Sequence, residues 1–353
     1  KIKKNFDQFM IDCFSNSFKS IKNLKKYMKK VIVTGGAGFI GSHIVELLVE
    51  KGFNVVVIDN FETGRADNLS KVKKKITIVK QDISKYSKIE NYFKNCHYVF
   101  HLAALADIVP SIENPEKYYE TNVTGSLNIL RASKKFGVKK VLYAASASCY
   151  GVVKKFPTDE NNKIMTEYPY ALTKNLGEQL MVHWSKVFKL STISLRLFNV
   201  YGLRSRTTGA YGAMFGVFLA QKINNKPLTI VGDGKQSRDF TYVTDVANAF
   251  YLASRSKIFH DIYNVGTGKP TSVNFVANKI GGKKIFIPKR PGEPDKSQAD
   301  IKKISQNLKW KPKISLDKGI NLLLKNIGDW KSAPVWTPAK ISVKTKKWFQ
   351  YLK

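Results

Sequence analysis

The sequence predicts an α/β fold built on a doubly wound parallel sheet, and three observations predict it. Short runs rich in Val and Ile alternate with longer helical stretches from residue 31 to about residue 145. A glycine-rich turn joins the first apolar run to the first helix. Two of the helical stretches are followed by glycine, which is favoured where a helix ends. After about residue 200 the alternation weakens, which indicates a smaller mixed α/β region.

The predicted elements follow one another in a regular order. Strands are expected at residues 31–34, 54–59, 76–79, 97–102 and 140–144, and they are too apolar to be half exposed. Helices are expected at 38–51, 84–93 and 115–136, with Gly52 and Gly137 at the ends of two of them. A helix at 169–188 and a strand at 191–196 continue the series. Such βαβ repetition implies the parallel sheet of a Rossmann fold.

The first predicted strand ends in a turn that contains Gly35, Gly38 and Gly41, and a helix follows directly. Glycines let the backbone turn tightly and approach a pyrophosphate, whose charge then lies at the helix N-terminus. The second strand ends at Asp59, 18 residues after Gly41, where a carboxylate bonds the adenine ribose hydroxyls and repels a 2′-phosphate. The sequence therefore predicts NAD rather than NADP. Asp82 follows the third strand and is placed either to reach the adenine or to be an ordinary solvated aspartate.

Tyr170 and Lys174 are four residues apart in a predicted helix, so their side chains share one face. A phenol, whose ordinary pKa is about 10, needs a neighbouring cation to act as a base near neutral pH. Tyr168 is six residues from Lys174 and is not expected on that face. Ser146 follows the fifth predicted strand, where doubly wound sheets place their chemistry.

These motifs resemble, in kind and in order, those of the extended short-chain dehydrogenase/reductase family. The resemblance is to its NAD-dependent nucleotide-sugar epimerases and dehydratases, above all the UDP-glucose and UDP-N-acetylglucosamine 4-epimerases. The matching segments run from about Lys29 to Asp329. They are residues 34–41, 59–60, 82–83, 101–104, 122–125, 146 with 150–151, 170 with 174, 197–202 and 232–239.

The resemblance implies a role for each matched residue. Tyr170 is the general acid/base, Lys174 holds the nicotinamide ribose and lowers the pKa of the tyrosine, and Ser146 bonds the sugar hydroxyl that is oxidised. The implied NAD-binding residues are Gly35, Gly38, Phe39, Ile40, Gly41, Asp59, Asn60, Asp82, Ile83, Leu102, Ala103, Ala104, Asn122, Tyr170 and Lys174. The implied substrate contacts are Ser146, Asn199, Tyr211, Arg238, Arg290 and Ser297, and no metal site is implied.

The residues after Ser146 favour one reaction within the family. Ala147 and Ser148 stand where the 4,6-dehydratases carry an Asp-Glu pair, and Ser148 also stands where the decarboxylases carry Glu. Without a second acid/base, the resemblance implies a 4-epimerase, which oxidises C4, lets the 4-keto sugar turn and returns the hydride to the opposite face. Ser297 matches a position where tyrosine restricts some members to non-acetylated sugars, so both UDP-glucose and UDP-N-acetylglucosamine fit. UDP-glucuronate 4-epimerase or another NDP-sugar epimerase or dehydratase stays open.

Composition divides the chain of 353 residues into four parts. Residues 1–27 form a basic amphipathic extension, which either binds a surface or is dispensable. Residues 28–200 are predicted to form the NAD-binding Rossmann domain, with returning segments around 235–265, and 201–330 the substrate-binding region. Residues 331–353 form a basic tail with two tryptophans, which we expect to be docked.

The net charge of +34 raises a rival hypothesis of a polyanion-binding protein, and a non-catalytic dinucleotide sensor is a second rival. Only eight of the basic residues are Arg, and 13 of the charges lie in residues 1–30 and 331–353, which argues against a nucleic-acid interface. Three widely spaced cysteines and no long apolar run predict a cytoplasmic protein without an integral membrane segment. The resemblance implies a homodimer through helices at 112–136 and 169–189.

Overall fold

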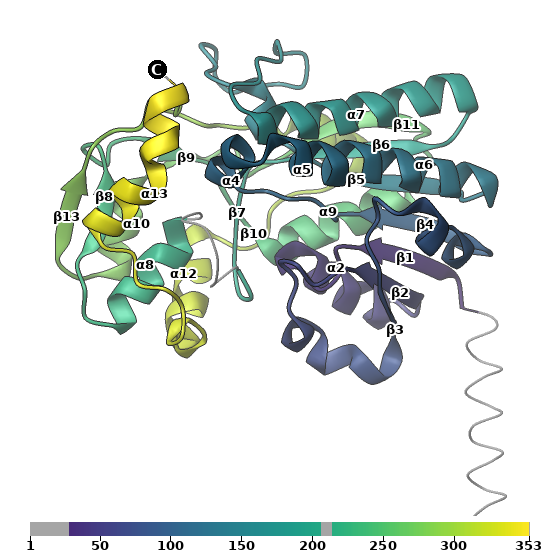
Figure 1. Ribbon diagram of the computed structural model, residues 1–353, viewed down its shortest axis with the longest axis horizontal. Helices are drawn as coiled ribbons and strands as arrows, with labels where there is room; N and C mark the ends of the chain where they lie inside the picture. Colours follow the sequence, from purple (N-terminus) through teal and green to yellow (C-terminus); the bar gives the residue numbers. More distant parts are fainter. Residues whose placement is uncertain (1–27, 206–213, 353) are drawn as a thin grey trace, which may run out of the picture.

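A computed structural model describes residues 28–205 and 214–352, and a sheet of seven parallel strands lies at its centre (Figure 1). The strand order is β11-β6-β5-β4-β1-β2-β3. The strands are β1 (Lys30–Thr34), β2 (Asn54–Asp59), β3 (Thr77–Lys80), β4 (Cys96–His101), β5 (Lys140–Ser146), β6 (Thr192–Leu197) and β11 (His260–Val265). Every neighbouring pair is parallel, which confirms the predicted doubly wound sheet.

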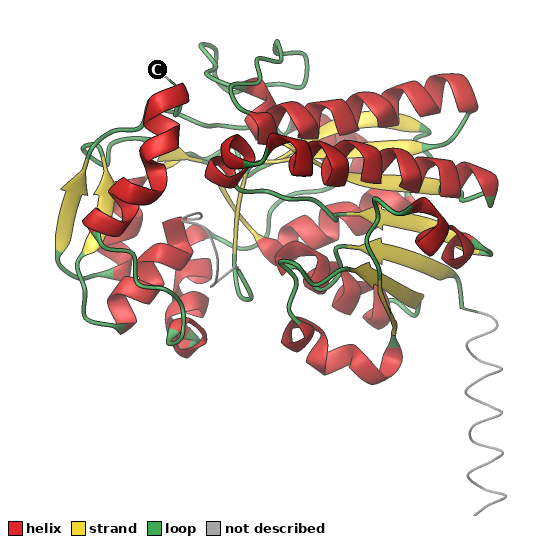
Figure 2. Ribbon diagram, in the orientation of Figure 1, coloured by secondary structure: helices red, strands yellow, loops and turns green. Residues whose placement is uncertain are grey.

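Helices cover both faces of this sheet (Figure 2). α2 (Phe39–Glu50) and α9 (Val243–Arg255) pack on one face, and α6 (Gly125–Lys135) and α7 (Pro169–Phe188) on the other. Alternate residues of a strand therefore enter different cores: Val31 and Val33 pack with α2 and α9, whereas Ile32 packs with α6 and α7. Burial on both faces explains why these strands read as continuous apolar runs.

Two of the predicted helices are broken up in the structure. The stretch expected as one helix at 115–136 consists of α5 (Pro115–Tyr119), a π-helical turn (Glu120–Thr124) and α6. The π turn contains Asn122, whose buried amide group forms hydrogen bonds with the backbone of Leu105 and the hydroxyl of Thr173. These are tertiary contacts, which the helix propensity of the sequence does not predict. The helix expected at 84–93 is α3 (Tyr86–Ile89) followed by a 3₁₀ turn, η2 (Glu90–Phe93).

The sequence did not predict α4 (Ile108–Glu113) or the 3₁₀ helix η1 (Ala66–Lys75). In contrast, both helix-ending glycines are confirmed. Gly52 and Gly137 have φ angles of +77° and +66°, in the left-handed region that glycine adopts without strain.

The C-terminal region has a hydrophobic core of its own, which contains buried Leu219, Ile230, Val276, Leu323 and Trp330. It is built from α8 (Met214–Ile223), the parallel pair β8 (Leu228–Val231) and β13 (Lys284–Ile287), α10 (Val273–Ile280), α12 (Leu316–Lys325), η5 (Ile327–Trp330) and α13 (Pro338–Tyr351). Short strands connect it to the sheet domain: β7 (Asn199–Tyr201) pairs with β10 (Phe240–Tyr242), and β9 (Ser237–Arg238) with β12 (Thr271–Ser272). α11 (Lys302–Leu308) packs beside β11.

The amphipathic segment predicted at residues 1–27 and the candidate Tyr211 lie outside the described residues. Within the described ranges, no helix combines the length and the hydropathy that crossing a membrane requires.

Candidate active site

A cavity of about 650 Å³ lies where the carboxyl ends of the sheet strands meet the C-terminal region. Most residues that the sequence singles out contribute to its wall. They are Gly35, Gly38, Phe39, Ile40, Gly41, Asp59, Asn60, Asp82, Ile83, Leu102, Ala103, Ala104, Ser146, Tyr170, Lys174, Asn199, Arg238 and Arg290. The topology explains this gathering, because all strands of a parallel sheet end at the same edge.

The glycine turn between β1 and α2 leaves no room for side chains. A Cβ on Gly41 would lie 2.1 Å from the carbonyl oxygen of Gly35, and one on Gly35 would lie 2.6 Å from the backbone nitrogen of Ala103. Gly38 is the N-cap of α2, and no side chain caps this helix. A backbone surface at a helix N-terminus suits a pyrophosphate, so the turn fits the phosphates of a dinucleotide.

Asp59, the last residue of β2, is hydrogen-bonded to the same turn. Its carboxylate oxygens accept hydrogen bonds from the backbone nitrogens of Ala37 at 2.9 Å and Phe61 at 2.8 Å. Burial raises the pKa of this carboxyl group, and the two hydrogen bonds oppose that rise. Each carboxylate oxygen has a second lone pair, so the group fits a ribose diol as well.

The backbone after β4 forms the opposite wall and is fixed by a buried histidine. The ring of His101 is bonded to Thr34 Oγ1 at 2.7 Å and to Ser126 Oγ at 2.9 Å. Burial lowers the pKa of His101 to about 3, so the ring is neutral at physiological pH. Thr34 Oγ1 also accepts from the backbone nitrogen of Ala103, which ties β1, β4 and the cavity wall together.

Tyr170, Ser146 and Lys174 meet at the end of β5 and the start of α7. The Tyr170 hydroxyl is 3.4 Å from Ser146 Oγ, which in turn is 2.7 Å from Ser148 Oγ. Lys174 is buried, and its Nζ lies 4.3 Å from the centre of the Tyr143 ring. The arrangement brings a phenol, a hydroxyl and an amino group to one part of the cavity wall.

Burial dominates the acid–base properties of these groups. It raises the pKa of Tyr170 to about 12 and lowers that of Lys174 to about 8. Desolvation of the phenolate outweighs the hydrogen bonds from Ser146 and Ser148, which act in the opposite direction on the pKa of Tyr170.

Tyr168 is closer to the site than its sequence position suggests. Its ring stacks on that of Tyr170, with the ring centres 6.4 Å apart and the planes 10° from parallel. Tyr168 occupies the N-cap position of α7, where the backbone is still extended, so helical spacing does not apply to it. Burial raises the pKa of Tyr168 well above its usual range.

The two arginines of the predicted substrate site approach one carboxylate. Arg238 Nη2 donates to Glu293 Oε1 at 2.9 Å, and Arg290 Nη1 is 3.9 Å from Glu293 Oε2. All three side chains line the cavity. Glu293 was not among the predicted site residues, although its position three residues after Arg290 is a spacing at which opposite charges commonly pair.

Two predicted residues are not on the cavity wall. Asn122 lies behind it, bonded to Leu105 and Thr173, so it supports the wall after β4 rather than lining the cavity. Ser297 is next to the site, where its backbone nitrogen donates to Ser237, but the residue is not part of the lining. In contrast, Trp336 and Trp348 of the C-terminal tail line the cavity, and no family motif pointed to them.

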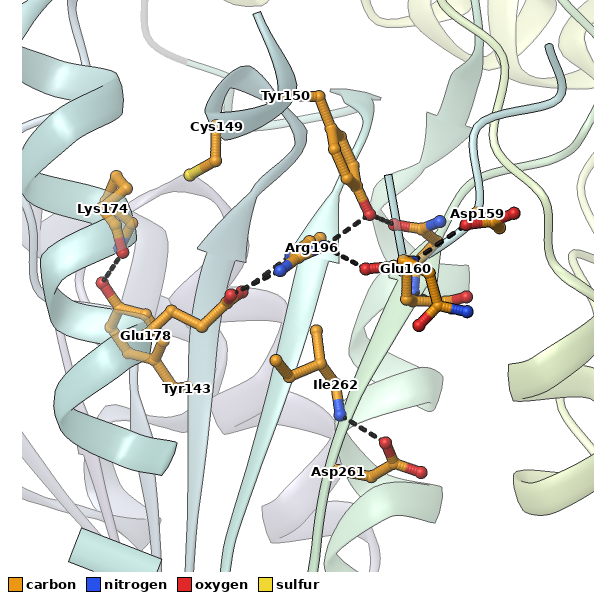
Figure 3. A network of polar contacts seen from close by, with 12 residues as sticks. Tyr143, Cys149, Tyr150, Asp159, Glu160, Lys174, Glu178, Arg196, Asp261 and Ile262 are labelled. Carbon is orange, nitrogen blue, oxygen red and sulfur yellow. Dashed lines mark hydrogen bonds and ion pairs between the residues drawn. The ribbon is translucent and has the colours of Figure 1, made fainter. Parts of the chain in front are cut away.

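A buried ion pair holds α7 against the sheet (Figure 3). Arg196 of β6 donates to both carboxylate oxygens of Glu178, from Nε at 2.9 Å and from Nη2 at 2.6 Å. Its Nη1 donates to the Tyr150 hydroxyl at 2.8 Å, and that hydroxyl donates to Asn264 of β11. The side chains of Arg196 and Glu178 are only 5% and 4% exposed. Because Glu178 is one turn beyond Lys174, the pair fixes the helix that carries Tyr170 and Lys174.

The fold and the cavity are those of an α/β enzyme that binds a dinucleotide. The comparison with known families agrees: residues 31–266 match the NAD dependent epimerase/dehydratase family, and the chain belongs to it. It is an NAD-dependent enzyme of the extended short-chain dehydrogenase/reductase type, as the resemblance implied.

Individual relatives are similar over most of their length. The putative UDP-glucose 4-epimerase of Methanocaldococcus jannaschii is 38% identical over 307 residues, which are 85% of this chain and 97% of that protein. The structure of the Thermotoga maritima UDP-glucose 4-epimerase with UDP-glucose matches with a TM-score of 0.80 and 35% identity, covering 84% of this chain and 97% of that one. The UDP-N-acetylglucosamine 4-epimerase of Methanobrevibacter ruminantium, solved with UDP-N-acetylmuramic acid, matches with a TM-score of 0.79 and 32% identity, over 85% and 99% of the two chains.

Removing one charge of the buried pair should destabilise the fold. Glu178→Gln leaves the Arg196 guanidinium buried without a counter-charge, and we expect it to lower the free energy of unfolding by about 3–5 kcal/mol. Urea denaturation followed by circular dichroism measures this change. The matched control is Glu90→Gln, which breaks the exposed ion pair with Lys135 and should change stability little. An unfolding midpoint of Glu178→Gln equal to that of the wild type would contradict the assigned role.

Proposed function

We propose that this protein is a UDP-hexose 4-epimerase that acts on UDP-glucose, UDP-N-acetylglucosamine or both. The observation that carries the proposal is the grouping of Tyr170, Ser146 and Lys174 on the cavity wall, with Ala147 and Ser148 directly after Ser146. This grouping supplies one acid/base and no carboxylate at the two positions where dehydratases of the family carry them. The similarity to two solved UDP-sugar 4-epimerases supports the same substrate class.

The residues that would hold NAD are the glycine turn, Asp59 and Lys174, which offer backbone N–H groups, a ribose acceptor and an ammonium group. NAD, when bound, supplies the acceptor for the hydride of C4 and a positive charge beside the phenol. Tyr170 takes the proton of the C4 hydroxyl and later returns it to the ketone oxygen. Ser146 forms a hydrogen bond with the same substrate oxygen. Its Oγ lies 3.4 Å from the Tyr170 hydroxyl. Because burial raises the pKa of Tyr170 to about 12, the phenolate forms only when a cation is close.

The epimerisation requires the nucleotide to stay fixed while the sugar turns. We assign the anchoring to Asn199, Arg238 and Arg290, which line the cavity. A guanidinium group makes charge-assisted and often bidentate bonds to phosphate oxygens, so two of them hold a diphosphate firmly. The sugar then has the remaining space of the 650 Å³ cavity in which to present either face.

Tyr170→Phe tests the assigned acid/base. The variant should keep its NAD and its fold, because only one hydroxyl is removed, and should lose turnover by at least about 10²-fold. The measurement is the rate of conversion of UDP-glucose to UDP-galactose by NMR, with NAD content determined after denaturation. Tyr168→Phe is the matched control, since its ring stacks on Tyr170 and its hydroxyl is not assigned a proton transfer. Undiminished turnover in Tyr170→Phe would exclude the mechanism.

The identity of the sugar is tested with a panel of substrates and one substitution. UDP-glucose, UDP-N-acetylglucosamine and UDP-glucuronate are incubated with the wild type and with Ser297→Tyr. We expect the larger side chain to spare UDP-glucose and to reduce turnover of the N-acetyl sugar, because it occupies the space of the acetyl group. Ser237→Thr, a change on the neighbouring strand that contacts Ser297, serves as the control. Equal effects on both sugars would reject Ser297 as a selectivity residue, and exclusive turnover of UDP-glucuronate would favour the alternative substrate.

We also propose that two copies associate through the α6 and α7 face. α7 exposes apolar side chains, with Leu172 and Val187 about half exposed and Phe188 beside them. Sedimentation velocity should find a dimer in the wild type, and Val187→Glu should shift the population to monomer. A wild-type monomer at micromolar concentration would refute this assembly.

The compartment that we propose is the cytoplasm, and the state of the two cysteines within the described residues supports it. Cys96 and Cys149 are free and buried, and burial raises the pKa of both thiols to about 12. Thiols of this kind are inert as nucleophiles and need no oxidising environment.

A further inference from the structure

The C-terminal helix α13 forms part of the substrate cavity. It begins at Pro338, after the side chain of Thr337 accepts a hydrogen bond from the backbone nitrogen of Lys340. Its buried residues Ile341, Thr345 and Trp348 recur at steps of four and three, so one face of the helix is turned inward. Figure 1 shows α13 in yellow beside α4, and contacts between the two helices join the tail to the sheet domain.

Trp348 makes the contacts that connect this helix to the substrate site. Its indole nitrogen donates to the carbonyl oxygen of Pro291 at 2.8 Å. Its ring lies 5.2 Å from the guanidinium carbon of Arg290, within the range of a cation–π interaction. Both Trp348 and Arg290 line the cavity. Trp348 therefore contacts both the backbone of the loop at Pro291 and the guanidinium group of Arg290.

A second contact fixes the helix from the other side. Lys344 of α13 forms an ion pair with Glu113 of α4 at 3.0 Å, and both side chains are about one third exposed. α4 continues the cavity wall at Ile108 and Val109. The helix thus connects α4 with the loop at Arg290.

The mode by which Trp348 holds Arg290 matters for the charge that the cavity presents. Glu293 serves both Arg238 and Arg290, so the three groups together keep one positive charge. A second carboxylate in place of Trp348 would position Arg290 equally well but would cancel that charge. An aromatic face attracts a guanidinium group without neutralising it, which leaves the cation able to bind phosphate.

We propose that Trp348 is a positioning residue for Arg290, which it holds in place to bind the diphosphate of the nucleotide substrate. The inference rests on the proposed function, since it takes Arg290 as a diphosphate ligand. The C-terminal tail would then contribute to substrate affinity and not to the proton transfer at Tyr170.

The test compares three substitutions of one residue, with UDP as the probe. Trp348→Leu keeps an apolar side chain without an aromatic face, and we expect it to weaken UDP binding about tenfold in titration calorimetry. Trp348→Ala should weaken it at least as much, whereas Trp348→Phe, which keeps a ring, should stay within about threefold of the wild type. The KM for UDP-glucose should rise with the Kd, with kcat and NAD content unchanged. Val343→Ala is the control on the same helix, because Val343 is 78% exposed.

A double-mutant cycle shows whether Trp348 acts through Arg290. In an Arg290→Met background, Trp348→Leu should have no further effect on the Kd of UDP. Additive losses would overturn the proposal, as would a Trp348→Leu variant that binds UDP like the wild type. If Trp348→Ala does not fold, the Leu and Phe variants decide the question. A wild-type protein that binds no UDP would instead refute the proposed function.

Discussion

The buried ion pair between Arg196 and Glu178 is the interaction on which the active site depends. It joins α7 to β6 at a place where neither charge reaches water, so each group needs the other to remain folded. Around it, Tyr150 and Asn264 extend the bonding to η4 (Ala147–Tyr150) and β11. The Tyr143 hydroxyl donates to the carbonyl oxygen of Lys174, which adds a second tie between sheet and helix. The helix that carries Tyr170 is therefore positioned by polar groups that do not line the cavity.

The charge of the protein takes on a different meaning once the cavity is known. A net charge of +34 suggests a polymeric anion, yet the basic groups that line the cavity are few. Lys174, Arg238 and Arg290 face it, and Arg238 and Arg290 share Glu293. So few cations suit small anionic ligands rather than a polymer. Most of the other lysines at residues 28–205 and 214–352 lie on exposed surface, where solvent screens them.

Much of the fold was predictable because its determinants are local. Strands buried on both faces are continuous apolar runs, and the glycines at 35, 38 and 41 are needed for sterically obvious reasons. The presence of Tyr170 and Lys174 on one cavity wall follows from helical spacing. What could not be predicted arises from contacts distant in sequence. Asn122 in the π turn forms hydrogen bonds to Leu105 and Thr173. Tyr168 can stack on Tyr170 because it is the N-cap residue of α7 and its backbone is extended. Glu293 and Trp348 become part of the site only when the C-terminal region folds over the sheet.

The position of Asp59 has a consequence for the evolution and engineering of cofactor preference. The carboxylate that the sequence predicts to exclude a 2′-phosphate also accepts hydrogen bonds from the backbone of Ala37 and Phe61. A neutral, shorter residue that admitted NADP would leave a buried N–H group at Ala37 without its acceptor. Selectivity and local architecture are thus encoded by one side chain. A lineage could change its redox cofactor only by first acquiring a substitute acceptor for this backbone, so preference for NAD is protected by the requirements of folding.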